Sequence, residues 1–186
     1  MAFDSRSDGP AENPYAPLMG RTYVGLDETG DITILDAARV RTLSAWVGRI
    51  IPGNENWPSA AELDTVGYVD AILGLAPELR PVLLAGIDAA EAIARREHGA
   101  SFSEIPDAAK IAILVELERV EAREAFSVIL ELTYEAYYRA EPVLAIVKER
   151  TGFDITRTVQ GAPIKPFDTD KLTRVSLMPD RYRSAS

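Results

Sequence analysis

The 186-residue chain contains no cysteine and a single histidine, His98. These absences exclude disulfides, thiolate metal sites, iron–sulfur ligation and cysteine nucleophiles, and leave too few imidazoles for a histidine-rich metal site. Positive charge is also scarce, because 20 Lys and Arg stand against 29 Asp and Glu and give a net charge of −9. Such a chain is repelled by phosphates and anionic headgroups, so we expect no nucleic acid partner and no direct membrane contact.

Long apolar runs and export signals are missing as well. Charged residues interrupt the most apolar stretch, residues 111–138, every few positions, so no membrane span is expected. The first 25 residues contain no basic segment followed by an apolar run and no twin-arginine pair. We therefore expect a cytoplasmic protein. A periplasmic location is the alternative if a partner carries the export signal or a leader has been removed.

The sequence also lacks the motifs of common catalytic and cofactor sites. Neither G-x-G-x-x-G nor G-x-x-x-x-G-K-[ST] occurs, and there is no Glu-x-x-His of the kind that di-iron bundles use. His98 falls in the last turn of an expected helix, where the helix dipole already explains it. Carboxylate pairs such as Glu131 and Glu135 indicate a solvated helix surface. We expect no catalytic residue, no metal ligand and no cofactor-binding residue in this chain.

Helical periodicity dominates the middle of the chain. Apolar residues recur at spacings of three and four from about Asp36 to Arg150. Asp36 is placed to cap a first helix that ends at Pro52-Gly53, and a capping box from Ser59 to Glu62 starts a second that continues to residue 73. Further helices are expected over about 77–98, 106–117, 121–140 and 142–150.

The periodicity also predicts which faces are buried. The third helix is rich in alanine, which lets neighbouring helices approach closely, and Gly99 is placed to end it. Pro106 suits the first position of the fourth helix, where its missing amide donor costs nothing. The fourth helix is expected to bury Ile111, Leu114, Val115 and Leu117. The fifth is expected to bury Phe126, Ile129, Leu130, Leu132, Thr133 and Tyr137.

The predicted fold is therefore all-α, an irregular bundle of five to six helices. Residues 1–31 are rich in Gly, Pro, Asn, Asp and Ser and are expected to form an extended N-terminal arm. Residues 32–152 form the helical domain, and residues 153–186 an extended C-terminal tail. This tail has more basic than acidic side chains, which favours a segment that lies across a surface, its own or a partner's.

Aromatic residues supply the candidates for a functional surface. Tyr134, Tyr137 and Tyr138 share one helical face, and such a face either lines the core or presses against another protein. Trp57 lies in a polar loop beside the Pro52-Gly53 turn. An exposed Trp at such a place is typical of an interface anchor.

The order of three segments resembles the gluconate 2-dehydrogenase subunit 3 family. They are RIIPG at 49–53, VGYVD at 66–70 and TYEAYY at 133–138, and the resemblance spans about residues 34–183. It implies a small helical subunit without a cofactor. Such subunits pair with a large FAD-containing subunit of the glucose-methanol-choline oxidoreductase family, which oxidises a sugar or a sugar-derived alcohol. The small subunit assists folding, stability or export.

The function expected from this resemblance is a non-catalytic small subunit that stabilises the flavoprotein of a sugar or glycoside dehydrogenase, with FAD in the partner. Many relatives carry a twin-arginine signal, and many have Tyr-Gly-Gly-Asn after the tyrosine helix, where this chain has residues 144–152. A soluble sugar or glycoside dehydrogenase therefore fits better than a membrane-linked, gluconate-oxidising one. The alternative is a free-standing helical enzyme or small-molecule-binding domain that uses Tyr134, Tyr137 and Tyr138.

The expected interface includes the arm and the tail. Obligate interfaces usually bury more than roughly 2,000 Å², which is more than one helix face of this domain offers. The tail would then wrap onto the large subunit, or else close this chain's own core. The residues expected at the partner interface are Trp57, Tyr134 and Tyr138 of the helical domain, the aromatic anchors Phe167 and Tyr182, and the cations Arg181 and Arg183, which would meet acidic groups.

Overall fold

The computed structural model describes residues 29–155, which contain six α-helices and no β-sheet. The all-α prediction is therefore confirmed, while the expected arm and tail fall almost wholly outside the described residues. The helices are α1 (Ala37–Ile50), α2 (Thr65–Leu75), α3 (Arg80–His98), α4 (Asp107–Glu116), α5 (Arg123–Arg139) and α6 (Glu141–Thr151). Two 3₁₀ turns (Ala60–Glu62 and Pro77–Leu79) and one π-helical turn (Leu117–Glu121) join them.

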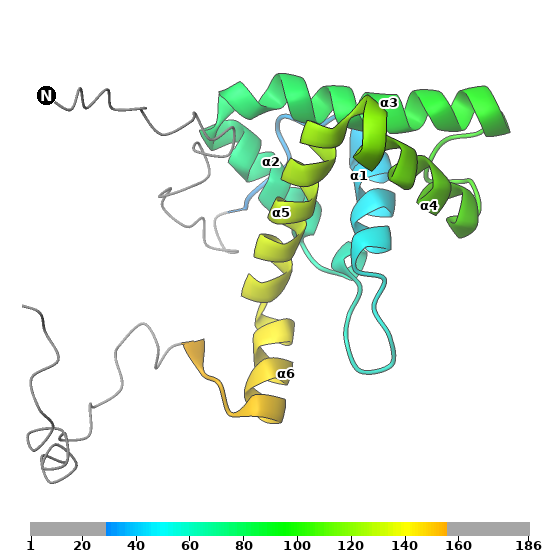
Figure 1. Cartoon of the computed structure of the whole chain (residues 1–186). Helices are drawn as coiled ribbons and strands as arrows, with labels where there is room; N and C mark the ends of the chain where they lie inside the picture. The colour runs from blue at the N-terminus through cyan, green and yellow to red at the C-terminus, as the bar shows by residue number, and fades with distance from the viewer. Residues whose placement is uncertain (1–28, 156–186) are drawn as a thin grey trace, which may run out of the picture. The chain divides into compact units, whose positions relative to one another are not determined.

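Helix α5 is the element around which α1, α2 and α3 gather. It contacts all three, and α3 runs across the top of the bundle in Figure 1. Trp46 of α1 is completely buried, and its ring centroid lies 5.9 Å from Phe126 of α5 and 6.5 Å from Phe102. The largest fully buried side chains are Trp46, Tyr68, Phe102, Leu43, Leu73, Leu83, Ile87, Ile93, Ile113, Leu117, Ile129 and Leu132.

Several predicted helix ends are confirmed by their capping geometry. The carboxylate of Asp36 accepts hydrogen bonds from the amides of Ala38 and Arg39, both at 2.9 Å, and so caps α1. Gly99 and Gly152 follow α3 and α6 in the left-handed region, at φ 69° and 73°. A residue with a Cβ is strained in that region, so glycine ends both helices there.

The start of the second helix differs from the prediction. The Ser59–Glu62 capping box forms, but it caps the short 3₁₀ turn rather than α2. Leu63 then adopts an extended conformation, with φ −105° and ψ 169°, and α2 begins at Thr65. A capping box satisfies the free amides of one turn only, so it does not oblige the helix to continue beyond that turn.

The predicted buried face of the fourth helix was wrong at two positions. Ile111 is 51% exposed and Val115 is 37% exposed, whereas Ile113 is buried with Leu114 and Leu117. Both faces of α4 carry isoleucine, so spacing alone leaves the orientation of the helix ambiguous. The π-helical turn that follows α4 holds Leu117 in the core, and Ile113, one turn earlier, shares its face. In α5 the predicted core residues are buried, apart from Phe126 and Leu130, which are partly buried.

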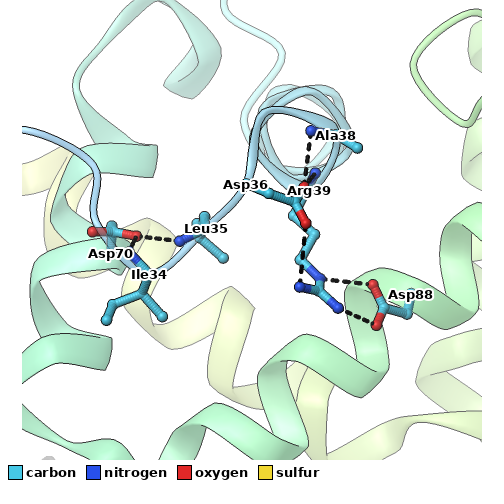
Figure 2. A network of polar contacts seen from close by, with 7 residues as sticks. All are labelled: Ile34, Leu35, Asp36, Ala38, Arg39, Asp70 and Asp88. Atoms are coloured by element: carbon cyan, nitrogen blue, oxygen red, sulfur yellow. Dashed lines mark hydrogen bonds and ion pairs between the residues drawn. The ribbon is translucent and has the colours of Figure 1, made fainter.

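A buried carboxylate sets the position of the chain just before α1. Asp70 of α2 accepts hydrogen bonds from the amides of Thr33 at 2.7 Å, Ile34 at 2.9 Å and Leu35 at 2.7 Å. Figure 2 shows the carboxylate facing the Ile34 and Leu35 amides. Three backbone donors compensate the cost of burying the charge, so α2 and the segment before α1 are held together.

Two further polar links join α1 to α3. Arg39 donates two hydrogen bonds to the carboxylate of Asp88, at 2.9 and 2.7 Å (Figure 2). Glu91 accepts hydrogen bonds from the Thr42 hydroxyl at 3.1 Å and from the Phe102 amide at 3.0 Å. Burial raises the pKa of the Glu91 carboxyl. These hydrogen bonds, and one from the Ser101 hydroxyl, lower that pKa by more than burial raises it, so it lies below its usual range.

The contact between α3 and α5 depends on a missing side chain. A Cβ added to Gly86 of α3 would lie 2.4 Å from the Cβ of Ala125 on α5. Real Cβ atoms do not approach this closely, so the two helices reach their observed separation only with glycine at this position. The close packing expected from the alanine-rich sequence of this helix is confirmed here.

Replacing Asp70 by Asn tests the link between α2 and the segment before α1. Asp70→Asn removes the charge and one acceptor, and we expect the free energy of unfolding to fall by about 2 kcal/mol, as measured by urea denaturation. Asp88→Asn is the matched control, because its exposed ion pair with Arg39 contributes little. Equal losses in the two variants would contradict the role given to Asp70.

Two glycine substitutions test the α3–α5 contact. We expect Gly86→Ala to lower the free energy of unfolding by about 1–3 kcal/mol, because the added methyl group overpacks the contact with Ala125. Gly74→Ala in α2 is the control, since its Cβ would meet nothing within 4 Å, and this variant should be slightly more stable. Thermal unfolding of both variants measures the difference. A stabilised Gly86→Ala variant would overturn the argument.

Candidate functional site

The turn after α1 is built around one glycine. Helix α1 ends at Ile50, and Gly53 follows with φ +74°, in the left-handed region that favours glycine. A Cβ at Gly53 would also lie 2.5 Å from the backbone nitrogen of Ser59. Both the conformation and the space therefore require glycine in the RIIPG segment.

Hydrogen bonds close the loop that follows this turn. Asn54 and Trp57 exchange backbone hydrogen bonds at 2.8 and 3.2 Å. The Ser59 hydroxyl and the Ala60 amide both donate to the carbonyl of Ile51, each at 3.0 Å. The end of the loop is thus tied back to the end of α1, and Trp57 sits in a defined position between them.

Tyr137 of α5 anchors this loop to the helical core. Its side chain is buried, and its hydroxyl donates a hydrogen bond to the carbonyl of Pro58 at 3.0 Å, across 79 positions of sequence. Burial raises the pKa of the Tyr137 phenol, and neighbouring Tyr138 raises it further. The phenol therefore stays protonated at neutral pH and keeps its role as a donor.

The loop and the tyrosines of α5 line an open pocket of about 330 Å³. Tyr134 and Tyr138 are 44% and 53% exposed, and their rings stack with centroids 6.2 Å apart and an interplanar angle of 9°. The Tyr138 ring also meets Tyr137 edge-on, with centroids 5.3 Å apart. The residues that line this aromatic pocket are Ile50, Ile51, Pro52, Gly53, Asn54, Trp57, Tyr134, Tyr137 and Tyr138.

The structure brings together three of the residues expected at a partner interface. Trp57, Tyr134 and Tyr138 line the same pocket, although the loop and the helix are far apart in sequence. Tyr137 lines the pocket as well, but unlike the other two tyrosines its side chain is buried in the core. The remaining candidates, Phe167, Arg181, Tyr182 and Arg183, lie outside the described residues. The interface role of all seven stays a prediction.

One member of this surface was missed by sequence reasoning. The guanidinium of Arg150, in the last turn of α6, lies 5.3 Å from the centroid of the Trp57 ring. At that distance a cation interacts favourably with the face of an indole. No local pattern indicates this contact, because it depends on how α6 returns toward the loop.

The chemistry of the aromatic pocket is that of a binding surface. Its polar residues are the tyrosines, Asn54 and Trp57, none of them charged, and most of its wall is apolar. Within residues 29–155, no group of three or more His, Cys, Asp or Glu side chains is arranged to hold a metal ion. In the same range no helix combines the length and apolar character needed to span a bilayer. His98 is exposed at the end of α3 and does not line this pocket.

Tyr137→Phe tests how firmly the core holds the loop. The variant leaves the Pro58 carbonyl without its donor, and we expect the free energy of unfolding to fall by about 1 kcal/mol in urea denaturation. Tyr134→Phe is the matched control, because the Tyr134 hydroxyl makes no hydrogen bond within the described part of the chain. Equal stability of wild type and Tyr137→Phe would show that the bond to Pro58 does not anchor the loop.

Comparison with known proteins assigns the chain to a family. The sequence profile described as Gluconate 2-dehydrogenase subunit 3 matches residues 37–153, which run from the first residue of α1 to two residues beyond α6. No curated protein and no solved structure matched the chain. The matched range covers more than half of the sequence and includes both the loop and the tyrosine helix of the aromatic pocket. The chain belongs to the gluconate 2-dehydrogenase subunit 3 family.

Proposed function

We propose that this protein is a non-catalytic small subunit that stabilises the flavoprotein of a sugar or glycoside dehydrogenase. The family name marks its members as subunits of a dehydrogenase complex. The proposal goes further in naming a flavin-dependent partner of the glucose-methanol-choline type, which would hold FAD and oxidise the substrate. The observation that carries it is the aromatic pocket, which the RIIPG and TYEAYY segments form together.

The exposure of the aromatic pocket favours a protein partner. Trp57 is only partly buried, and Tyr134 and Tyr138 leave about half of their surface in water. Trp, Tyr and Arg are the residues most enriched at the energetic centres of interfaces, and Arg150 completes that set. The stacking of the rings and the hydrogen bonds of the loop hold these side chains in place in the free subunit. This reduces the conformational entropy lost on binding.

The pocket and the tail would act together in this complex. One helix face and one loop cover less than the area that an obligate interface requires. We propose that Phe167 and Tyr182 add aromatic contacts on the large subunit, and that Arg181 and Arg183 meet acidic groups there. The aromatic pocket would then be the part of the interface that the helical domain contributes.

A double substitution in the pocket tests the proposed interface. The chain is co-expressed with a flavoprotein of the glucose-methanol-choline type from the same source and purified through a tag on the flavoprotein. We expect Tyr134→Ser/Tyr138→Ser to reduce the co-purified small subunit at least about tenfold, because both exposed rings leave the interface. Ile111→Ser is the matched control, since Ile111 is similarly exposed on α4 and does not line the pocket.

Two outcomes would contradict the proposal. Full co-purification of the double variant, with circular dichroism showing a folded chain, would remove the pocket from the interface. Turnover by the small subunit alone would instead support a free-standing enzyme.

A binding function for the pocket itself is the second candidate, because its volume of about 330 Å³ is sufficient for a small molecule. Saturable binding of a small molecule to the isolated chain, lost in the same double variant, would support that candidate.

A further inference from the structure

A second pocket, of about 390 Å³, lies between α1 and α4 and has a different chemistry from the aromatic pocket. Three of its lining residues are cations, and none is acidic, in a chain whose net charge is −9. The two pockets share no lining residue. The residues that line this basic pocket are Val40, Arg41, Ser44, Ala45, Gly48, Arg49, Ser59, Ala61, Ser103 and Lys110.

The periodicity of α1 gathers two of the cations on one side of the helix. Arg41 and Arg49 are two turns apart, which is roughly 12 Å along the axis, and Ser44 lies on the same face between them. Arginine side chains are long enough to reach over this interval from both ends. Lys110 of α4 closes the pocket from the opposite wall, and its side chain is only 13% exposed.

The charged residues that line this pocket are all cations. Arg49 and Lys110 share a single carboxylate, that of Asp107, and the Lys110 ammonium lies 3.2 Å from it. Arg41 is exposed and makes no ion pair with any residue in the range 29–155. The carboxylates of Glu62 and Glu104 accept hydrogen bonds from the amides of Ser59 and Ser101, and the carboxylate of Asp36 attracts Arg41 electrostatically. These carboxylates keep their charge, but none of them lines the pocket, whereas three cations do.

We propose that the basic pocket binds a small molecule through a phosphate group. A phosphate presents three strong acceptor oxygens, enough to engage Arg41 and the donors that Arg49 and Lys110 do not use on Asp107. The Ser44 hydroxyl, which makes no hydrogen bond within the described chain, is a further donor. The volume exceeds that of a single phosphate, and apolar side chains such as Val40 and Ala45 line the space for the rest of the ligand.

This site is independent of the proposed subunit function. It needs neither the flavoprotein nor the aromatic pocket, so the tyrosine variants should bind phosphate like the wild type. A failure to detect phosphate binding would therefore not affect the interface proposal. A failure of the interface proposal would likewise not affect the phosphate site.

Titration of the full-length chain with inorganic phosphate tests the proposal. Calorimetry or NMR chemical shifts follow binding at constant ionic strength set with sodium chloride, and acetate is titrated in parallel. We expect saturable phosphate binding that acetate does not reproduce. Arg41→Gln should weaken it roughly fivefold, because an exposed charge pair contributes modestly. Arg123→Gln is the matched control, being an exposed arginine on α5 that also makes no ion pair within residues 29–155.

A second variant gives a change in the opposite direction. Asp107→Asn removes the carboxylate that competes for Arg49 and Lys110, so phosphate should bind more tightly than to the wild type. Circular dichroism confirms that each variant is folded. The proposal is overturned if binding does not saturate, if acetate binds as well as phosphate, or if Arg41→Gln and Arg123→Gln weaken binding equally. Weaker binding to a folded Asp107→Asn variant would also overturn it.

Discussion

The buried carboxylate of Asp70 is the contact on which the position of α1 depends. An ionised group inside a protein is stable only when donors surround it, and the amides of Thr33, Ile34 and Leu35 supply them. These bonds fix the chain immediately before the Asp36 cap. These bonds thereby determine the direction of α1. The burial of Trp46 in α1 and the position of the RIIPG segment at the end of the helix both depend on that direction.

Helix α5 connects the packing of the bundle to its surface. Near its beginning, Ala125 occupies the space that a side chain at Gly86 would fill, which lets α3 pack closely against α5. Near its end, Tyr137 holds the loop at Pro58, and Tyr138 lies beside it in solvent. One helix therefore anchors both the core and the aromatic pocket. A change in its packing against α3 is expected to displace the tyrosines as well.

Helix α1 borders two pockets of contrasting chemistry. Its last turn and the following loop form the aromatic pocket with α5, where no lining residue is charged and Arg150 lies against the Trp57 ring. Its middle face forms the basic pocket with Lys110. An apolar aromatic surface favours a protein partner, because burying it removes apolar area from water. A pocket lined by three cations and by no carboxylate favours a small anion, because an anion there gains charge-assisted hydrogen bonds.

Local signals in the sequence determined the helical class and several helix ends, because capping and left-handed glycines act within a few residues. Asp36, Gly99 and Gly152 are of this kind, and the pattern around Trp57, Tyr134 and Tyr138 marked the residues that meet in the aromatic pocket. Spacing also placed Tyr137 in the core and left Tyr138 for a surface, and the structure buries the first and exposes the second. The sequence could not distinguish Ile113 from Ile111, because both satisfy helical spacing. Only the tertiary structure decided between these two isoleucines, since burial depends on which neighbour a helix face meets. The same reason explains why Asp70 and Arg150 escaped notice: their partners lie far away in sequence.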